Sequence, residues 1–319
     1  MTQPAWTPER EITLAEAERL VGTRFPNLTG GEAELFAQGW DNTAVRFRIP
    51  RTGELIFRFP RRTIALPGVR RELAWLPQLA ARLPLPIPVP AYAGSWGPDG
   101  GEPWPFWGGP MLAGSELAEA AIESDQRETV AAELGAFLRV LHSLPPADFE
   151  ISGDCSLAYD PMGRGHPARR AAGTAQCLDR LRERGTGIPF DAVTELLARA
   201  DRLPAPPLPG VICHGDLHVR HVLVGGKGIT GVIDWGDLCL GDRAVDLSIA
   251  FAGFSGEQRE AFFAAYGPID AERELRARAL ALSLSALLTE YALAQAPPDG
   301  PASPLLPGVS DGLTRALIL

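Results

Sequence analysis

Residues 211–237 read VICHGDLHVRHVLVGGKGITGVIDWGD and contain three of the chain's five histidines. Two short apolar runs, VLV and GVI, flank the glycine-rich segment GGKG, and glycine readily adopts the positive φ values of a tight turn. We therefore expect a β-hairpin, which would bring His221, before its first strand, close to Asp234, after its second. Asp216 would lie on the loop that leads into the hairpin.

The acids of this stretch have the spacing of a kinase catalytic centre. Asp216 precedes His221 by five residues, and Asp234 follows the predicted hairpin in the sequence I-D-W. In kinases an acid on the catalytic loop accepts the proton of the substrate hydroxyl, a metal-facing side chain follows it, and a later aspartate holds Mg²⁺. The spacing therefore predicts phosphoryl transfer.

The histidines also permit a different interpretation. His214, His218 and His221 are spaced i, i+4 and i+7, as zinc ligands on one face of a helix would be. Gly215 and the β-rich run after His221 argue against a helix at this place. A zinc hydrolase is therefore the less favoured alternative.

The segment H-G-D-x4-H followed by I-D-W resembles the aminoglycoside phosphotransferase (APH) family of small-molecule kinases, whose members carry H-G-D-x4-N and I-D-[WF]. Histidine at the asparagine position is similar to the macrolide phosphotransferase branch. The resemblance implies that Asp216 orients the acceptor hydroxyl and accepts its proton. It implies that Asp234 holds Mg²⁺ against the phosphates of ATP or GTP, and that His221 takes the second metal-facing position. Supporting roles around this centre are implied for His214, Asp237 and Asp246.

The lysine content sharpens one expectation. Lys227 is the only lysine of the chain, and it falls in the predicted hairpin. A kinase normally carries a lysine on its third strand to hold the α- and β-phosphates. Arg58, in the segment I-F-R-F-P, is the substitute by position, and an arginine fork can hold phosphate oxygens. Glu72, on the helix expected at 68–83, is its candidate ion-pair partner.

The N-terminal part of the chain reads as an antiparallel sheet. Runs at 34–38, 43–49 and 54–59 form a meander, in which the second and third alternate apolar and polar side chains, and two more strands are expected at 89–94 and 105–112. The turn G-W-D-N, which also resembles many APH members, lies where a kinase folds its phosphate-covering loop, but it has only one glycine. The family layout implies nucleotide contacts in this turn and at the backbone after the last strand. The residues concerned are Gly39, Asp41, Asn42, Gly109 and Met111.

Downstream of residue 114 the apolar periodicity becomes helical. The resemblance and this pattern together predict an α+β fold of the bilobal protein-kinase type. Residues 1–108 would form a nucleotide-binding lobe with a small antiparallel sheet and one main helix, 109–114 a hinge, and 115–319 a larger, mostly helical catalytic and substrate-binding lobe. Helices are expected at 125–143, with Ser124 or Asp125 as cap, and at 167–185, 191–202, from Asp242 onward, 256–266, 271–295 and 313–319.

Composition bounds the class of protein. The 319 residues are 45% hydrophobic, which allows one large domain or two modest ones. The sequence has no run of 18 apolar residues, so we expect no membrane-spanning helix. The start MTQPAW lacks the basic and apolar segments of a secretory signal, so we expect a cytoplasmic protein. The net charge of −9 disfavours nucleic acid or an anionic membrane as partner, and the four scattered cysteines indicate inert core thiols.

These observations lead to one functional hypothesis. The chain transfers the γ-phosphoryl group of ATP or GTP, with Mg²⁺, to a hydroxyl of a small molecule, and an antibiotic is favoured as acceptor. Residues 275–289 hold six leucines and no acid, which suits a macrolide-like molecule better than an aminoglycoside. Two alternative functions stay open: a kinase of an endogenous amino alcohol or sugar, and a nucleotide-binding module without transfer activity. A monomer or weak homodimer is expected.

Overall fold

A computed structural model of the chain describes residues 7–50, 52–97, 102–151, 153–226, 228–295 and 303–318. Lys227, the start MTQPAW and Leu319, on which parts of the sequence analysis rest, lie outside these described residues. The chain forms two compact units. The first is drawn from residues 1–82, 86–112 and 149–156, and the second from 83–85, 113–148 and 157–319.

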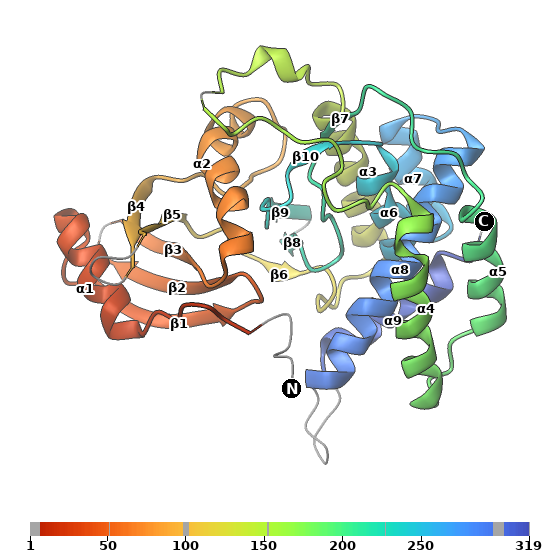
Figure 1. Ribbon diagram of the computed structural model, residues 1–319, viewed down its shortest axis with the longest axis horizontal. Coiled ribbons are helices and arrows are strands. Elements are labelled where there is room, and N and C mark those ends of the chain that lie inside the picture. Colours follow the sequence, from red (N-terminus) through yellow and green to blue (C-terminus); the bar gives the residue numbers. More distant parts are fainter. Residues whose placement is uncertain are drawn as a thin grey trace. The chain divides into compact units, whose positions relative to one another are not determined.

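The first unit is built on a five-stranded antiparallel sheet with the strand order β1-β2-β3-β5-β4 (Figure 1). The three-stranded meander predicted from the sequence is confirmed. The expected strand at 89–94 starts later, because Pro88 and Pro90 carry no N–H group for a ladder. The strands are β1 (Glu32–Gln38), β2 (Asn42–Ile49), β3 (Gly53–Pro60), β4 (Tyr92–Trp96) and β5 (Trp104–Pro110).

One face of this sheet carries the core of the unit. Along β2, Val45, Phe47 and Ile49 are buried, whereas the intervening Arg46 and Arg48 pair with Glu34 on the other face. Helix α1 (Leu14–Arg24) contributes to the same core, and its first turn is closed by a Thr13–Glu16 capping box.

Helix α2 (Leu66–Ala80) is the main helix of the first unit. It buries the apolar side chains of Val69, Leu76 and Leu79, and also the carboxylate of Glu72. Pro77 lies inside the helix without ending it. The helix therefore brings one acidic side chain to a buried position beside the sheet.

The second unit consists mainly of helices, with three short strand pairings near the predicted catalytic segment (Figure 1). The predicted hairpin is confirmed, with β8 (Val222–Gly225) paired to β9 (Gly228–Val232). Strand β6 (Ser115–Glu116) adds to β8, and β7 (Val211–Cys213) pairs with β10 (Cys239–Gly241). The helices are α3 (Ser124–Leu141), α4 (Pro167–Glu183), α5 (Phe190–Ala200), α6 (Ala244–Gly253), α7 (Glu257–Tyr266), α8 (Ala271–Gln295) and α9 (Leu305–Arg315).

Helix α8 is the core element of this unit and packs against α4, α5, α6 and α9. By length and composition it is the one helix among the described residues that would be able to cross a membrane. Of its most apolar window, however, 67% is buried inside the protein. The apolar character of α8 is therefore explained by the helices that pack around it.

Two expectations about helix ends are wrong. The final helix was expected at 313–319, but α9 begins at Leu305. Pro304 is its N-cap and Pro307 lies in its first turn, where a missing N–H group costs no helical hydrogen bond. Helix α3 has Glu123 as its N-cap in place of Ser124 or Asp125, with no side-chain capping bond.

Candidate active site

The hairpin brings together the two residues that the sequence predicted to meet. His221 Nε2 lies 3.4 Å from Asp234 Oδ2. The Ile233 N–H donates to the His221 carbonyl at 2.9 Å, which ties the end of the hairpin to its beginning. Asp234 has a φ of 66°, a left-handed conformation that is uncommon for residues other than glycine and is concentrated at functional sites.

The tautomer of His221 follows from the hydrogen bond that its second ring nitrogen, Nδ1, makes. Nδ1 lies 2.8 Å from the Asp216 carbonyl oxygen, which is an acceptor only, so Nδ1 carries the proton and donates. In the neutral ring, Nε2 then presents a lone pair toward Asp234. Two electron-pair donors that face each other in this way fit a divalent cation between them, because imidazole nitrogen and carboxylate oxygen are both metal ligands.

His218 extends the same group of ligand atoms. Its ring centroid lies 3.8 Å from that of His221, and its Nε2 lies 3.9 Å from Asp216 Oδ2. The ligand atoms of Asp216, His218 and His221 all lie within 4.8 Å of one another. The residues form a loop and not a helix, so the geometry of a zinc site on one helix face is absent from this part of the structure.

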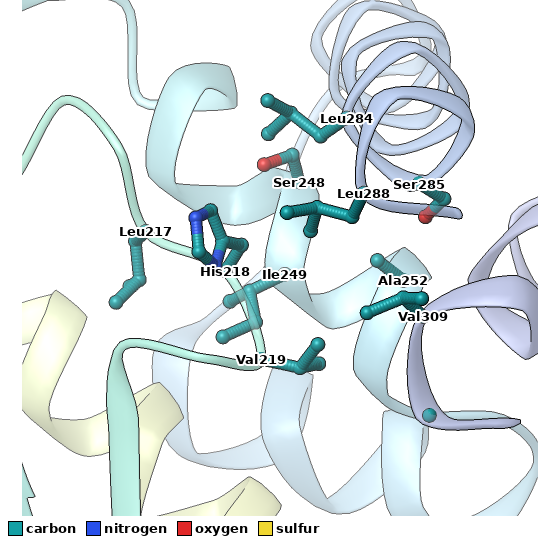
Figure 2. Close-up of a pocket in the computed structure, with 11 residues that line it drawn as sticks. Leu217, His218, Val219, Ser248, Ile249, Ala252, Leu284, Ser285, Leu288 and Val309 are labelled. Carbon is teal, nitrogen blue, oxygen red and sulfur yellow. The ribbon is translucent and has the colours of Figure 1, made fainter. Parts of the chain in front are cut away.

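Beside His218 lies a small apolar cavity. Figure 2 shows the ring beside Ile249 and Ser248 of α6, with Leu284 and Leu288 of α8 nearby. Burial lowers the pKa of His218 well below its ordinary value, and the neighbouring His221 and Arg220 lower it further. His218 is therefore a neutral ring that packs against His221.

Asp246, on α6, holds the catalytic loop from beneath. Its Oδ2 accepts from the His214 N–H at 2.8 Å and its Oδ1 from the Gly215 N–H at 3.0 Å. His142 Nε2 donates to Oδ2 at 3.1 Å, and the Tyr266 hydroxyl is bonded to the opposite ring nitrogen of His142. Burial alone would raise the pKa of Asp246, but the hydrogen bond from His142, its charge and the bond from Gly215 hold that pKa below the ordinary value.

Two further features fix the path of this loop. His214 is fully buried, and its Nε2 donates to the Ile233 carbonyl at 2.9 Å; burial lowers the pKa of its ring. Gly215 has a φ of 89°, and a Cβ atom there would lie 2.1 Å from the Asp237 carbonyl oxygen. Glycine is therefore required at this position, and the backbone sets the location of Asp216.

Arg164, which contacts the Asp216 carboxylate, was not among the site residues predicted from the sequence. Arg164 Nη2 lies 3.0 Å from Asp216 Oδ1, and its Nη1 lies 2.7 Å from Asp237 Oδ2. The same guanidinium donates to the Gly215 carbonyl. Arg164 precedes Asp216 by 52 residues in a glycine-rich loop, so no local spacing connects the two.

The loop of Arg164 is itself held in place. Asp160, which has a φ of 38°, accepts from the Arg164 N–H at 2.7 Å and from the Gly165 N–H at 2.9 Å. Arg276 of α8 donates to the Gly165 carbonyl at 2.7 Å. Arg164 is therefore anchored at its backbone as well as at its side chain.

In the first unit, the predicted pair of Arg58 and Glu72 is present. Arg58 Nη1 lies 3.0 Å from Glu72 Oε1, and Trp107 Nε1 donates to Glu72 Oε2 at 3.0 Å. The Glu72 side chain is 1% exposed and that of Arg58 is 14% exposed. Both oxygens of Glu72 are thus held, and Glu72 fixes the guanidinium of Arg58 on β3.

The turn between β1 and β2 is closed by its own backbone and by two arginines. The Gly39 N–H donates to the Asn42 carbonyl at 2.9 Å. Arg61 donates to the Gly39 carbonyl at 2.7 Å, and Arg62 pairs with the Asp41 carboxylate. Asp41 therefore acts within this structure as a side chain that shapes the turn.

The segment Gly109–Met111, which was expected to contact the base, has some of its backbone groups occupied within the first unit. The Met111 N–H donates to the Glu54 carbonyl at 2.9 Å. Gly109 lies in β5, and a Cβ atom there would lie 2.1 Å from the Val89 carbonyl oxygen. Glycine is therefore required at 109 by close packing within the first unit.

Comparison with known proteins agrees with this architecture. The sequence profile of the phosphotransferase enzyme family (APH) matches residues 32–279. An aminoglycoside 3'-phosphotransferase from Streptomyces fradiae is 33% identical over 156 residues, which are 47% of this chain and 52% of that protein. The chain thus spans about half the length of this curated relative.

Solved structures of antibiotic phosphotransferases share the fold. The GDP complex of an aminoglycoside 2'-phosphotransferase-IIIa superimposes with a TM-score of 0.68 at 19% identity, covering 96% of this chain and 99% of the other. A macrolide 2'-phosphotransferase from Brachybacterium faecium gives a TM-score of 0.60 at 22% identity, covering 95% and 98%. The predicted α+β kinase-like fold is confirmed, and the chain belongs to the phosphotransferase enzyme family (APH).

Proposed function

We propose that this chain transfers the γ-phosphoryl group of ATP or GTP to a hydroxyl group of a small molecule, and that the first acceptors to test are antibiotics. The observation that carries the proposal is the arrangement of Asp216 beside the facing pair of His221 Nε2 and Asp234 Oδ2, 3.4 Å apart. This is the set of groups that phosphoryl transfer needs: a carboxylate for the hydroxyl proton and ligands for a metal.

In this mechanism Asp216 orients the acceptor hydroxyl and accepts its proton. His221 and Asp234 would hold Mg²⁺, which supplies positive charge at the phosphate oxygens. In the first unit, Arg58 replaces the usual lysine and donates to phosphate oxygens, with Glu72 fixing its orientation. Catalysis then comes mainly from alignment and charge stabilisation.

His214, Asp237 and Asp246 act on the position of Asp216. Asp246 and His214 hold the backbone of the catalytic loop, and Asp237 shares Arg164 with the Asp216 carboxylate. The Gly39, Asp41 and Asn42 turn, with Gly109 and Met111, is proposed to contact the nucleotide. The solved aminoglycoside 2'-phosphotransferase-IIIa binds GDP and a solved spectinomycin phosphotransferase binds ADP, which supports a nucleotide donor without choosing between ATP and GTP.

The charge near Asp216 indicates what charge a suitable acceptor would carry. Asp216 and Asp237 share the single guanidinium of Arg164, which leaves one excess negative charge, fewer than the several ammonium groups of an aminoglycoside would match. The apolar wall expected on α8 is largely absent as a surface, since Leu280, Leu282 and Leu284 are buried in the core. We propose an acceptor of low positive charge, with macrolides as the first class to test and aminoglycosides next.

Two alternatives remain distinct from this proposal. A kinase of an endogenous amino alcohol or sugar would use the same site. A nucleotide-binding module without transfer activity is motivated by the replacement of lysine by Arg58 and by the single glycine of the turn at 39–42. A monomeric or weakly dimeric state, the absence of nucleic-acid and membrane partners and a cytoplasmic location stay predictions from composition.

The test incubates the purified protein with Mg²⁺, with ATP or GTP in parallel, and with a panel of macrolides, aminoglycosides and hydroxylated metabolites. Mass spectrometry of the acceptors should show the gain of one phosphoryl group on a panel member, and a chelator should abolish it. Gain only on a metabolite would select the endogenous kinase. Nucleotide binding without transfer to any member would overturn the proposal in favour of the binding module.

A further inference from the structure

The mechanism leaves one arginine of the second unit unexplained. Arg170 lies in the first turn of α4 with its side chain partly buried. Its buried Nε has no hydrogen-bond partner, and among the described residues its guanidinium forms no hydrogen bond or ion pair. A charge that is partly withdrawn from water without a partner is costly, and such groups are concentrated at functional sites.

Arg170 lines a cavity of about 20 Å³ enclosed by residues of α4, α5 and α8. Arg164 lines the same cavity, and its buried Nε is also without a partner among the described residues. Thr174 and Ser283 add hydroxyl groups, which are bonded to each other at 3.0 Å. None of the described residues that line this cavity is acidic. Its polar groups are therefore mainly cationic donors.

The start of α4 adds positive potential to this place. The N-cap residue His166 makes no side-chain capping bond, and the first turn contains no acid. It contains Arg169 and Arg170 instead. Cations at a helix N-terminus are unfavourable because the positive end of the helix dipole lies there, so an anion beside the partly buried Arg170 would offset the unfavourable charge.

The cavity is connected to the catalytic aspartate through one side chain. Arg164 reaches Asp216 with Nη2 at 3.0 Å. Burial lowers the pKa of Arg170, the nearby Arg164 lowers it further, and Asp216 and Asp160 act in the opposite direction. Arg170 therefore lies close enough to interact electrostatically with the Asp216 carboxylate, which would accept the proton of the acceptor hydroxyl.

We infer that this cavity is an anion-binding subsite for the acceptor, in which Arg170 and Arg164 Nε receive a carboxylate group. The inference rests on the proposed transfer to a hydroxyl group and changes the acceptor class, because the acceptor would carry an acid group together with its hydroxyl, which directs the search to hydroxylated acids in place of macrolides and aminoglycosides. A volume of about 20 Å³ holds roughly one water-sized group, so one carboxylate oxygen enters while the rest of the molecule stays outside. A nucleotide phosphate is bulkier than this space.

The test compares acetate with acetamide, which has the same shape and no charge, at constant ionic strength. Three proteins are used: the wild type, Arg170→Gln, and Arg169→Gln as the matched control, since Arg169 is exposed and adjacent on the same helix. Acetate at 100 times its Kd should raise the Tm of the wild type and of Arg169→Gln by about 5 °C. Acetamide should not, and Arg170→Gln should lose the response. Without acetate, Arg170→Gln should be at least as stable as the wild type, because it removes an unpartnered charge.

Equal acetate responses in all three proteins, no response in the wild type, or a large loss of stability in Arg170→Gln without acetate would overturn the inference. Acetate should also inhibit transfer competitively with the acceptor identified by the panel; competition with the nucleotide instead would contradict an acceptor subsite. The binding test uses no nucleotide, so the two proposals fail separately. A chain that binds acetate through Arg170 but transfers no phosphoryl group loses only the proposed function.

Discussion

Replacing Asp246 by asparagine is the perturbation that most directly tests how the fold positions the catalytic loop. The carboxylate is fully buried and accepts three hydrogen bonds, from the backbone N–H groups of His214 and Gly215 and from His142. An asparagine side chain has nearly the same shape, so the change removes charge and one acceptor without creating a cavity.

The magnitude follows from the geometry of those bonds. The His214 N–H faces Oδ2 and the Gly215 N–H faces Oδ1, so either orientation of the amide turns its NH₂ group toward one backbone donor. A buried donor without an acceptor costs about 1–3 kcal/mol, and weakening the charge-assisted bond from His142 adds about 1 kcal/mol. We expect the free energy of unfolding to fall by about 3 kcal/mol and Tm to fall by about 6–12 °C.

Activity should fall as well, because the displaced N–H group belongs to the loop that carries Asp216. A misplacement of about 1 Å costs roughly 100-fold in rate, so kcat should drop by about that factor at a temperature where the variant is folded. Thermal unfolding followed by circular dichroism and steady-state kinetics on the acceptor found by the panel measure the two effects.

Asp242→Asn is the matched control. Asp242 is also a buried acid, but its carboxylate accepts from the Ala244 N–H at 2.8 Å and lies 3.3 Å from Arg273, neither of which belongs to the catalytic loop. It should lose stability and keep kcat within about threefold, since it leaves the loop bonds intact. An Asp246→Asn protein whose kcat and Tm match the wild type would refute the reasoning, as would equal losses of kcat in both variants.

Three further predictions concern metal choice, the base and acid stability. His221→Asn replaces a nitrogen ligand by an amide oxygen, so the ratio of activity with Mn²⁺ to activity with Mg²⁺ should fall by about tenfold, and an unchanged ratio would exclude His221 as a ligand. Arg164→Gln removes the ion pair that holds the Asp216 carboxylate, so kcat should fall by about 100-fold while the KM for nucleotide stays the same. Arg164→Lys should recover part of the lost kcat. Equal kcat in the wild type and both variants would contradict a positioning role for Arg164. Because the pKa of Asp246 is lowered in the folded protein, its contribution to stability is present above its ordinary value of 3.8 and is lost as the pH falls below it. Wild-type stability should therefore fall more steeply than that of Asp246→Asn in acid, and parallel curves would contradict this assignment.

The sequence predicted the hairpin and its two flanking residues well, because the information is local. Two β-rich runs separated by glycines leave few alternatives, and the hairpin then places His221 and Asp234 together without knowledge of the rest of the chain. The pairing of Arg58 with Glu72 was also predictable, since a strand followed by a helix sets their separation.

Arg164 and Arg170 were not predictable in the same way. Their proximity to Asp216 depends on how the loop before α4 is held by Asp160 and by Arg276 of α8, residues distant in sequence. The sequence also does not show whether the leucines of α8 are surface or core, because their burial depends on four helices that pack around them. Such facts are set by tertiary packing and not by local pattern.

The central claim is that Asp216 is the base in transfer of a phosphoryl group to an acceptor hydroxyl. The most direct measurement compares wild type and Asp216→Asn for product formation by mass spectrometry and for nucleotide binding by calorimetry in the presence of Mg²⁺. The Asp216→Asn protein should bind nucleotide with a Kd within about threefold of the wild type and form product at least about 1,000-fold more slowly. Product formation at the wild-type rate in the variant would show that Asp216 is not the base.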